Sequence, residues 1–555
     1  MSSQTGLRVQ IATYNANLQG ADATRHDLTP WLIPTAEQAP VKPVSSAPLS
    51  NEKVLHADAY KSRNARALST HPSLPREAPD FYAVGFQELI PLHIGFAATG
   101  DSALYNTDLD IRKTIRPHQA VVSGNGMYAS QEEGGGPEGY PLLCRVDLVG
   151  IALFVYARER TPFSINKATK SNTSAASRVK EIRTAKVGTG LGGVMGNKGG
   201  VGARIVVGAA DGKGPDEVLT FVSSHLAAHD HNVLRRNRDW QQIVERMVFA
   251  PSCVSRLPLI QTPVAKLDPK NMDALKEKHA QSTQQSDKAK KAAPLDNNSY
   301  TIYDTTHLFV FGDLNHRIAL GKSELERAAS GSKKGPTSEP LSEERLHKAL
   351  EVGDWSALAG YDQLNYQRLA SPPKAFHGLT ELPIDEAGIP PTYKYVVTRT
   401  GKKTKQKPGG ITSDALDGQT LSKKRVPGWT DRILWASAPG KDDNDRHGAE
   451  VEFYRSIMQY THSDHKPVTT LLRLPAPASG KAEVATLSQL NPYPALPAWN
   501  RQALAISGLL LDRLVGYTWS LLLLAGGGSL AGGIIEVLVI GIITAWWFSQ
   551  SRTAA

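Results

Sequence analysis

The stretch His307–Asn315, "HLFVFGDLN", places an apolar run of aromatic and branched side chains directly before an aspartate and an asparagine. A short apolar run bounded by turn residues is typical of a buried β-strand. The same pattern recurs in "LRVQIATYN", "FYAVGFQE", "VGIALFVYA", "GVGARIVVG", "VLTFVSSHL", "DRILWAS" and "VTTLLRL". Apolar residues instead recur every three or four positions, as in amphipathic helices, in "HNVLRRNRDWQQIVERMVF" and "SEERLHKALEVGDWSAL". Many strands with a few helices predict an α/β or α+β sandwich.

Length and cysteine content limit the class of protein. The chain has 555 residues, more than a typical single domain, but an α/β fold with insertions can hold this much chain around one core. Its two cysteines, Cys144 and Cys253, are too few for a disulfide framework or a four-cysteine metal site, which suits a reducing compartment. The start, "MSSQTGLRVQIATYN", has no apolar core of signal-peptide length, so we expect a cytosolic body.

The chain is basic, with a formal net charge of +10 at pH 7. Such an excess favours a polyanionic partner: a phosphoinositide, an inositol phosphate, a membrane surface or a nucleic acid. Charge alone does not choose among these four. Motifs that could bind phosphate must therefore decide.

Long polar connectors interrupt the strand pattern. We interpret them as loop insertions within one large domain, residues 1–475, at about 20–79, 157–180, 251–299 and 397–422. Their Pro, Ser, Lys and Gly content is typical of solvated or disordered segments.

The carboxyl-terminal part has a different composition. A Pro-rich stretch at 476–503 is interpreted as an extended linker, and the mostly apolar residues 504–548 as a membrane anchor. The segment 529–548 is long enough to cross a hydrocarbon core of about 30 Å. Its Trp546 and Trp547 fall where an interfacial aromatic belt is expected.

The first apolar run of the anchor is a weaker candidate for a membrane span. Asp512 and Arg513 lie within it, and each would cost about 2.5 to 3.5 kcal/mol at the centre of a bilayer. We expect this run either to pair with 529–548 as a helical hairpin or to lie in the interface. The alternative is a pair of buried core helices in the soluble domain.

Polar side chains stand at the ends of the predicted strands. Each alone is more often a turn or cap residue than a catalytic group. Together they offer carboxylates, amides and imidazoles without a cysteine cluster: Asn15, Glu88, His225, Asp313, Asn315, Asp431, Asp464 and His465. Because oxygen ligands suit Mg²⁺ better than Zn²⁺, this set favours metal-assisted phosphoryl transfer to water.

Eight blocks stand in a fixed order along the chain: "TYN", "FQE", "GLGGVMGNKGGVG", "SSHLAAH", "FGDLNHRI", "PPTYKY", "KKRVPGWTDRILW" and "SDHKPV". This series resembles the inositol polyphosphate 5-phosphatases of the exonuclease/endonuclease/phosphatase superfamily, from about Leu7 to Leu474. The resemblance implies a four-layer sandwich, in which two packed β-sheets are flanked by helices. His316, Thr430 and His229 depart from the residues usual in this family.

The resemblance also assigns roles at the metal and the water. Glu88, supported by Asn15, is similar to the Mg²⁺ position. Asp313 resembles the residue that orients and deprotonates the attacking water. Asp464 resembles a nearby acid that helps to organise water or metal.

Further roles at the phosphate are implied in the same way. Asn315 and His225 would grip the scissile phosphate. His465 would donate to phosphate oxygens as charge builds, with Asp431 holding its imidazole.

A second group of residues is predicted to bind the substrate. The glycines around Asn197 and Lys198 allow a close backbone approach to a phosphate, and the resemblance implies that Tyr393, Lys394, Lys423 and Arg425 hold the neighbouring 4-phosphate. Lysine and arginine are the physical choice for a phosphate, and a nuclease would not need such a pocket.

The sequence therefore predicts a Mg²⁺-dependent phosphatase that converts phosphatidylinositol 4,5-bisphosphate to phosphatidylinositol 4-phosphate. The 3,4,5-trisphosphate and soluble inositol polyphosphates are further candidate substrates. We expect the tail to anchor the protein in a membrane, with the endoplasmic reticulum as the expected compartment, the domain facing the cytosol and no nucleic acid bound. The alternatives are a non-catalytic phosphoinositide-binding module and a nuclease-like enzyme.

Overall fold

The computed structural model describes most of the predicted domain and the carboxyl-terminal helices. The described residues are 6–24, 26–33, 78–122, 139–159, 174–210, 212, 214–251, 299–329, 339–397, 410–438, 448–475, 486–526 and 528–553. Much of each predicted insertion lies outside these ranges.

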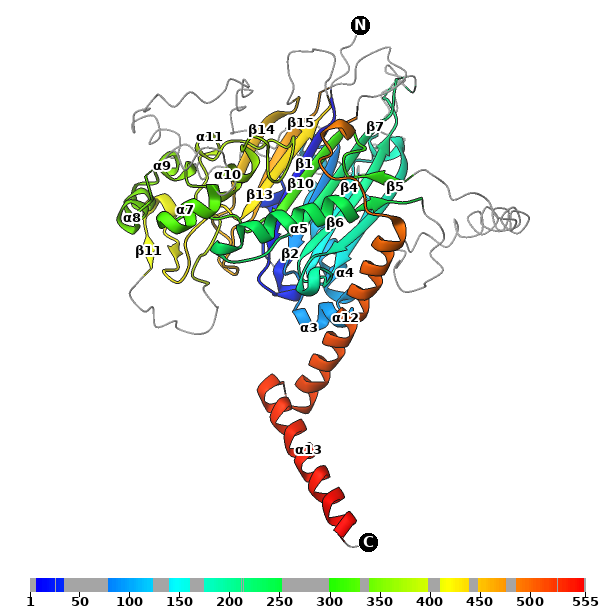
Figure 1. Ribbon diagram of the computed structural model, residues 1–555. Helices are drawn as coiled ribbons and strands as arrows, with labels where there is room; N and C mark the ends of the chain where they lie inside the picture. The colour runs from blue at the N-terminus through cyan, green and yellow to red at the C-terminus, as the bar shows by residue number, and fades with distance from the viewer. Residues whose placement is uncertain are drawn as a thin grey trace, which may run out of the picture.

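Two mixed β-sheets form the centre of the molecule (Figure 1). The first has the strand order β14 (Glu450–Ser456), β15 (Val468–Arg473), β1 (Arg8–Asn15), β2 (Phe81–Gln87), β4 (Ile151–Ala157) and β3 (Leu142–Leu148). The second has the order β13 (Asp431–Ser437), β10 (His307–Asp313), β7 (Glu217–His225), β6 (Gly199–Val207) and β5 (Val179–Gly188). All eight predicted strands are present, and β3, β5 and β14 were not predicted.

The main hydrophobic core lies between the two sheets. Ile11 and Phe81 of the first sheet and Phe221 and Phe311 of the second belong to one buried cluster. A Cβ at Gly85 would lie 2.6 Å from the Phe311 ring, so the sheets approach closely where β2 has no side chain. The sandwich is therefore held by apolar side chains that alternate inward from both sheets.

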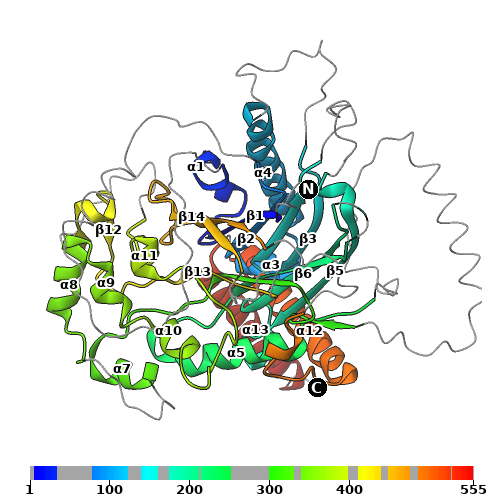
Figure 2. The same cartoon turned by 90° about the horizontal axis from the view of Figure 1, so that it is seen from above.

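Helices cover the outer face of each sheet, which gives the predicted four layers (Figures 1 and 2). The first sheet is covered by α1 (Thr29–Leu32) and α4 (Asp101–Val122), and α3 (Leu92–Ala97) follows β2. The second sheet is covered by α5 (Val233–Arg246), the first of the predicted amphipathic helices.

A lobe of short helices packs beside β13 at the left of Figure 1. It contains α7 (Gly321–Ala329), α8 (Glu343–Val352), α9 (Trp355–Ala359), α10 (Gln363–Arg368) and α11 (Ile384–Ala387). The second predicted helical segment forms α8 and α9. Short antiparallel pairs are made by β8 (Val248–Phe249) with β9 (Tyr300–Thr301) and by β11 (Ile411–Thr412) with β12 (Thr420–Leu421).

Two long helices end the chain: α12 (Ala498–Ala525) and α13 (Leu530–Thr553). Within the described residues, α12 is the one helix long and apolar enough to cross a membrane, judged by length and composition alone. It runs along the domain past α3, and α13 extends away from the sheets (Figure 1). All but the first residue of the segment 529–548 lie in α13, where the side chains of 536, 543 and 545–553 are outside the described set.

The residues before α12 contact the domain. The Leu496 amide donates to the Glu245 carbonyl at 2.9 Å, and the Leu487 amide donates to the Thr305 carbonyl at 3.0 Å. The described part of the predicted linker, from residue 486, therefore lies against the second sheet and α5.

Strand direction brings the polar strand ends together. β1 is parallel to β2, and β7 is parallel to β10, so these four strands end at one edge of the sandwich. β13 and β15 are antiparallel to their neighbours and begin at that same edge. The polar residues that follow or precede these strands are therefore placed side by side.

Candidate active site

Asp313 lies at the centre of the convergent strand ends. Its side chain is 1% exposed. The Asn15 Nδ2 donates to Asp313 Oδ2 at 2.9 Å across the two sheets, and the Asn315 backbone amide donates to Asp313 Oδ1 at 3.0 Å. The Asn315 Nδ2 adds a bond to Oδ2 at 3.2 Å, and His225 Nε2 lies 3.3 Å from the same oxygen. The carboxylate is thus fixed by donors from three strand ends.

The local backbone explains this placement. Asp313 is the last residue of β10 and is paired with His225 of β7 and Asp431 of β13. Gly312 has φ +137°, and a Cβ there would lie 2.0 Å from the Ser224 carbonyl oxygen, so only glycine fits. Asn315 has φ +57°, in the left-handed region that asparagine tolerates. The strand therefore ends in a sharp turn that directs its polar side chains into the site.

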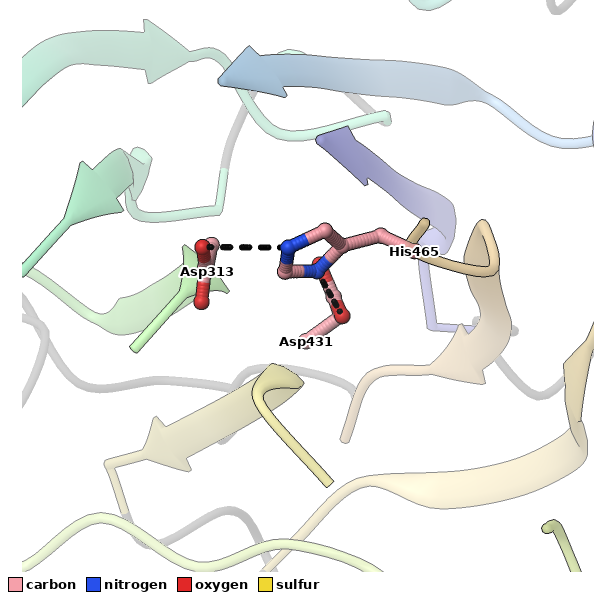
Figure 3. Close-up of side chains that lie close together, drawn as sticks. All are labelled: Asp313, Asp431 and His465. Atoms are coloured by element: carbon pink, nitrogen blue, oxygen red, sulfur yellow. Dashed lines mark hydrogen bonds and ion pairs between the residues drawn. The ribbon is translucent and has the colours of Figure 1, made fainter. Parts of the chain in front are cut away.

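His465 lies between two buried carboxylates (Figure 3). Its Nδ1 is 2.9 Å from Asp431 Oδ2, and its Nε2 is 3.9 Å from Asp313 Oδ2. The hydroxyls of Thr392 and Thr430 donate to Asp431 Oδ2 at 2.7 and 2.9 Å. Asp431 is thereby held in place, and it holds the imidazole in turn.

The charges of this cluster follow from its geometry. Burial opposes charge on His465, but the carboxylates of Asp431 and Asp313 raise its pKa to about 9. Burial likewise opposes charge on Asp313, but His465, His225 and Lys198 hold its pKa well below the usual range. At neutral pH the site therefore contains an ionised Asp313 beside a protonated His465.

Glu88 follows β2 and faces the same cavity. Its φ is +49°, an uncommon conformation for a non-glycine residue. The side chain is 31% exposed and lies 3.8 Å from His225 Nε2. Among the described residues, no hydrogen-bond donor satisfies its carboxylate. A partly open carboxylate that accepts no hydrogen bond from the described residues and is held in a strained turn is a candidate ligand for a cation.

The potential metal-ligand atoms near Glu88 suit a hard divalent cation. Asn15 Oδ1 accepts one hydrogen bond, from the Asn17 amide at 3.1 Å, and retains a second lone pair. Asp313, Asp431 and His465 also have potential ligand atoms within 4.8 Å of one another. We favour Glu88 with Asn15, because the Nδ1 of His465 is already bonded to Asp431. Oxygen ligands of this kind suit Mg²⁺.

The cavity at this edge has a volume of about 220 Å³ and a mostly polar lining. Its cationic side chains, Lys198, Arg317 and Lys394, surround the carboxylates, as a site for an anionic substrate requires. It is lined by Asn17, Glu88, Lys198, His225, Ala228, Asp313, Asn315, Arg317, Tyr393, Lys394, Asp464 and His465.

The structure brings some of the predicted substrate residues into this cavity and leaves others outside it. Lys198 Nζ contacts His225 Nε2, and burial lowers the pKa of the lysine. Lys394 Nζ donates to Asp464 Oδ2 at 2.6 Å, an ion pair within the cavity wall. The Tyr393 ring lies 4.5 Å from the His465 ring, centroid to centroid.

Asn197, Lys423 and Arg425 are not among the residues that line the cavity. Asn197 is half-buried, and its Oδ1 has no hydrogen-bond partner among the residues that the structure describes. Lys423 and Arg425 are exposed. Any contact of these three with a substrate would therefore require the substrate to extend beyond the described cavity, or their loops to move.

Sequence reasoning missed several residues of the site. Arg317 is 2% exposed and lines the cavity, and its guanidinium lies 4.7 Å from the Tyr393 ring centroid. It stands in the block "FGDLNHRI", where a basic residue beside two predicted catalytic groups was an available signal. Thr392 carried no signal, because its role depends on a contact with Asp431, which is 39 residues away.

Comparison with known proteins matches the chain to phosphatases of this fold. The type II inositol 1,4,5-trisphosphate 5-phosphatase of Mus musculus is 28% identical over 395 residues, covering 71% of this chain and 26% of the relative. The inositol-1,4,5-trisphosphate 5-phosphatase 1 of Schizosaccharomyces pombe is 27% identical over 398 residues, covering 71% and 24%. The chain thus spans about a quarter of the length of these relatives.

A solved structure and a family model were also matched. The inositol polyphosphate 5-phosphatase domain of SPsynaptojanin, in complex with inositol (1,4)-bisphosphate and calcium ion, has a TM-score of 0.44 and 20% identity. The match covers 92% of this chain and 91% of that one. The family model of endonuclease/exonuclease/phosphatase family 2 matches residues 12–471. Because this match covers most of the chain, the protein belongs to endonuclease/exonuclease/phosphatase family 2.

Proposed function

We propose that the protein is a Mg²⁺-dependent phosphatase that removes the 5-phosphate of phosphatidylinositol 4,5-bisphosphate and leaves the 4-phosphate. The observation that carries the proposal is the position of Asp313, fixed by Asn15 and Asn315 and facing His465 in a cationic cavity. Relatives named as inositol 1,4,5-trisphosphate 5-phosphatases support the substrate class.

The reaction adds water to phosphorus and breaks the bond between phosphorus and the inositol oxygen, which takes a proton from solvent and leaves as a hydroxyl group. Asp313 is ionised, so it accepts a hydrogen bond from the attacking water and orients it, and it receives the proton as the new bond forms. Because this carboxylate is a weak base, positioning is the larger part of its contribution. No covalent phosphoenzyme is required.

His465 and the neighbouring donors act on the phosphoryl oxygens. The protonated imidazole donates from Nε2, while the bond from Nδ1 to Asp431 fixes the orientation of the ring. His225 Nε2 and Asn315 Nδ2 also approach Asp313 Oδ2, at 3.3 and 3.2 Å, and would contact the same group. Bound Mg²⁺, held by Glu88 and Asn15, would neutralise charge on the phosphoryl oxygens.

Recognition of a second phosphate is assigned to the outer cations of the cavity. Lys394 is paired with Asp464, so a phosphate that binds Lys394 competes with this carboxylate. Arg317 Nη1 lies 3.5 Å from Asp230 Oδ1, and its Nε has no hydrogen-bond partner within the described structure. A substrate with two neighbouring phosphates would satisfy both cations, which favours a bisphosphorylated inositol ring over a single phosphodiester.

We also propose that the carboxyl-terminal helices bind the protein to a membrane with the domain on the cytosolic side, at the endoplasmic reticulum. The support is the apolar, exposed surface of α12 and α13, including Leu521, Leu524, Val537 and Ile540. Anchoring would raise the effective concentration of the domain at a lipid substrate.

The test is phosphate release by the full-length protein in detergent micelles. The substrates are phosphatidylinositol 4,5-bisphosphate, the 3,4,5-trisphosphate and inositol 1,4,5-trisphosphate, with duplex DNA as a comparison. We expect Mg²⁺-stimulated release from the inositol substrates and no cleavage of DNA. Asp313→Ala and His465→Ala should abolish release, whereas surface Asp385→Asn should not change it.

Two results would contradict this proposal. Binding of the lipids without phosphate release would identify a non-catalytic binding module. Cleavage of DNA with intact inositol substrates would identify a nuclease.

A further inference from the structure

Helix α12 is docked on the domain through one narrow face. Gly508, Asp512 and Gly516 are its buried positions, spaced by four residues, so they lie on one side of the helix. A Cβ at Gly508 would lie 2.4 Å from the Val194 carbonyl oxygen, and a Cβ at Gly516 would lie 2.3 Å from the Ala97 amide nitrogen. Both glycines are therefore required for the helix to approach this closely.

Asp512 is the polar centre of this contact. Its side chain is 4% exposed, although it lies in the most apolar part of the chain. The Gly196 amide donates to Asp512 Oδ1 at 3.1 Å and to Oδ2 at 3.2 Å, in a buried bond that joins residues 316 positions apart. A buried carboxylate is costly unless it is bonded, so this contact is specific and not a consequence of general apolar packing.

Arg513, the next residue of α12, contacts a second segment of the domain. Arg513 Nη1 donates to the Phe96 carbonyl at 2.6 Å, near the end of α3. Leu511, Val515 and Trp519 pack around Phe96 in the same small cluster. The helix α3 begins four residues after Glu88, so α12 supports the segment that follows the candidate metal ligand as well as the loop of Gly196.

The loop held by Asp512 connects β5 to β6 and carries two predicted substrate residues. Asn197 and Lys198 follow Gly196 directly, and Lys198 lines the cavity. On the opposite side the loop is held by α5, where Arg235 Nη2 donates to the Thr189 and Gly190 carbonyls at 2.8 and 2.9 Å. Through the hydrogen bond to Gly196, α12 therefore holds a loop that α5 holds from the other side.

We propose that α12 is part of the catalytic unit and that Asp512 is a positioning residue, which places Lys198 for the substrate phosphate by holding the Gly196 amide. This inference rests on the phosphatase activity proposed above. The carboxyl-terminal helix would then have two roles, because the element that leads into the apolar α13 also shapes the phosphate-binding loop.

The experiment uses the full-length protein in detergent micelles, with inositol 1,4,5-trisphosphate as a soluble substrate, so membrane attachment does not enter the result. Asp512→Ala removes the acceptor for Gly196. Asp512→Asn retains a carbonyl oxygen that can accept the same bond. Leu514→Ala is the matched control, because Leu514 is on the same helix and is 65% exposed.

We expect Asp512→Ala to raise KM about tenfold, the usual effect of losing a hydrogen bond to a charged group, with a smaller change in kcat. Asp512→Asn should restore most of the affinity, and Leu514→Ala should match the unmodified protein. Amide hydrogen exchange in residues 189–198 should be faster in Asp512→Ala alone.

An unchanged KM with unchanged exchange in 189–198 would overturn the proposal. Equal losses in Asp512→Ala and Asp512→Asn, together with a lower unfolding midpoint in both, would also overturn it by showing a purely structural role. If the unmodified protein releases no phosphate, the proposed function fails. The exchange comparison still decides in that case: faster exchange in Asp512→Ala supports the positioning contact, and unchanged exchange overturns it.

Discussion

His465 donates from Nδ1 to Asp431 Oδ2 at 2.9 Å, and this bond fixes which face of the imidazole the cavity presents. The Nε2 atom is left on the side of Asp313, 3.9 Å from its Oδ2. The two carboxylates, Asp431 and Asp313, therefore orient the imidazole ring of His465. They also keep it protonated. This arrangement makes the proposed catalytic role of His465 testable through Asp431, without altering the histidine itself.

Replacing Asp431 by Asn should lower kcat about 100-fold, within the range expected for a positioned acid or base. The amide retains the shape of the carboxylate but removes the negative charge that favours the imidazolium. Steady-state phosphate release measures the effect, with Asp385→Asn on the surface as the control. A kcat within threefold of the unmodified protein would show that the Asp431–His465 pair is not used in the reaction.

Activity should also fall at alkaline pH. The pKa of His465 is raised to about 9, so the protonated form is present at neutral pH and is lost as the pH rises through about 9. The same sign applies to stability, because a raised pKa in the folded state stabilises the protein most below the ordinary value of histidine.

A profile of kcat/KM against pH checks this expectation. In Asp431→Asn the alkaline limb should move to lower pH, because the main charge that raises the pKa of His465 is gone. If the alkaline limb does not move in Asp431→Asn, the fall in activity at high pH is caused by the titration of a group other than His465.

Replacing Glu88 by Gln should raise the Mg²⁺ concentration needed for half-maximal activity, by about tenfold or more. The amide is a weaker ligand for a hard cation than the carboxylate. Mg²⁺ titrations with Glu88→Gln and with the exposed control Glu344→Gln measure this directly. An unchanged Mg²⁺ requirement in Glu88→Gln would remove the metal role from this residue.

A buried ion cluster beside the site should dominate the response of stability to mutation. Arg432 Nη1 donates to both oxygens of Asp362 at 3.0 Å, and its Nη2 donates to Glu381 at 2.5 Å. Arg432→Met would leave the buried Asp362 without its cation and would leave Glu381 with Arg368 alone, at 3.3 Å, so we expect a loss of about 3 to 5 kcal/mol in the free energy of unfolding.

Denaturant titration measures this loss, with Arg345→Met on the exposed face of α8 as the control. The control should lose less than about 1 kcal/mol, because its charge is solvated. Equal losses of unfolding free energy in Arg432→Met and Arg345→Met would contradict the view that the buried ion cluster of Arg432 stabilises the fold.

The sequence predicted the interior of the fold better than its edges. The unpredicted strands β3, β5 and β14 are all at the edges of the sheets, and each has partly exposed positions. Their polar residues weaken the apolar run that marks a buried strand. The edge strand β13 was predicted because the helical lobe covers it and all of its residues are buried.

The site was predictable where its residues stand at strand ends and form part of the resemblance. Asp313, His225 and His465 were found in this way. The pairing of Lys394 with Asp464 was not, because it depends on side-chain contacts across 70 residues. Asp512 was interpreted only as a residue whose charge is unfavourable inside a membrane. Hydropathy cannot show that its hydrogen-bond partner is a backbone amide of the domain, 316 residues away.

The central claim is tested most directly by the position of the phosphate that is lost from phosphatidylinositol 4,5-bisphosphate. The full-length protein with Mg²⁺ should produce phosphatidylinositol 4-phosphate as its lipid product, and Asp313→Ala should produce none. Formation of phosphatidylinositol 5-phosphate, or equal activity in Asp313→Ala, would contradict the account.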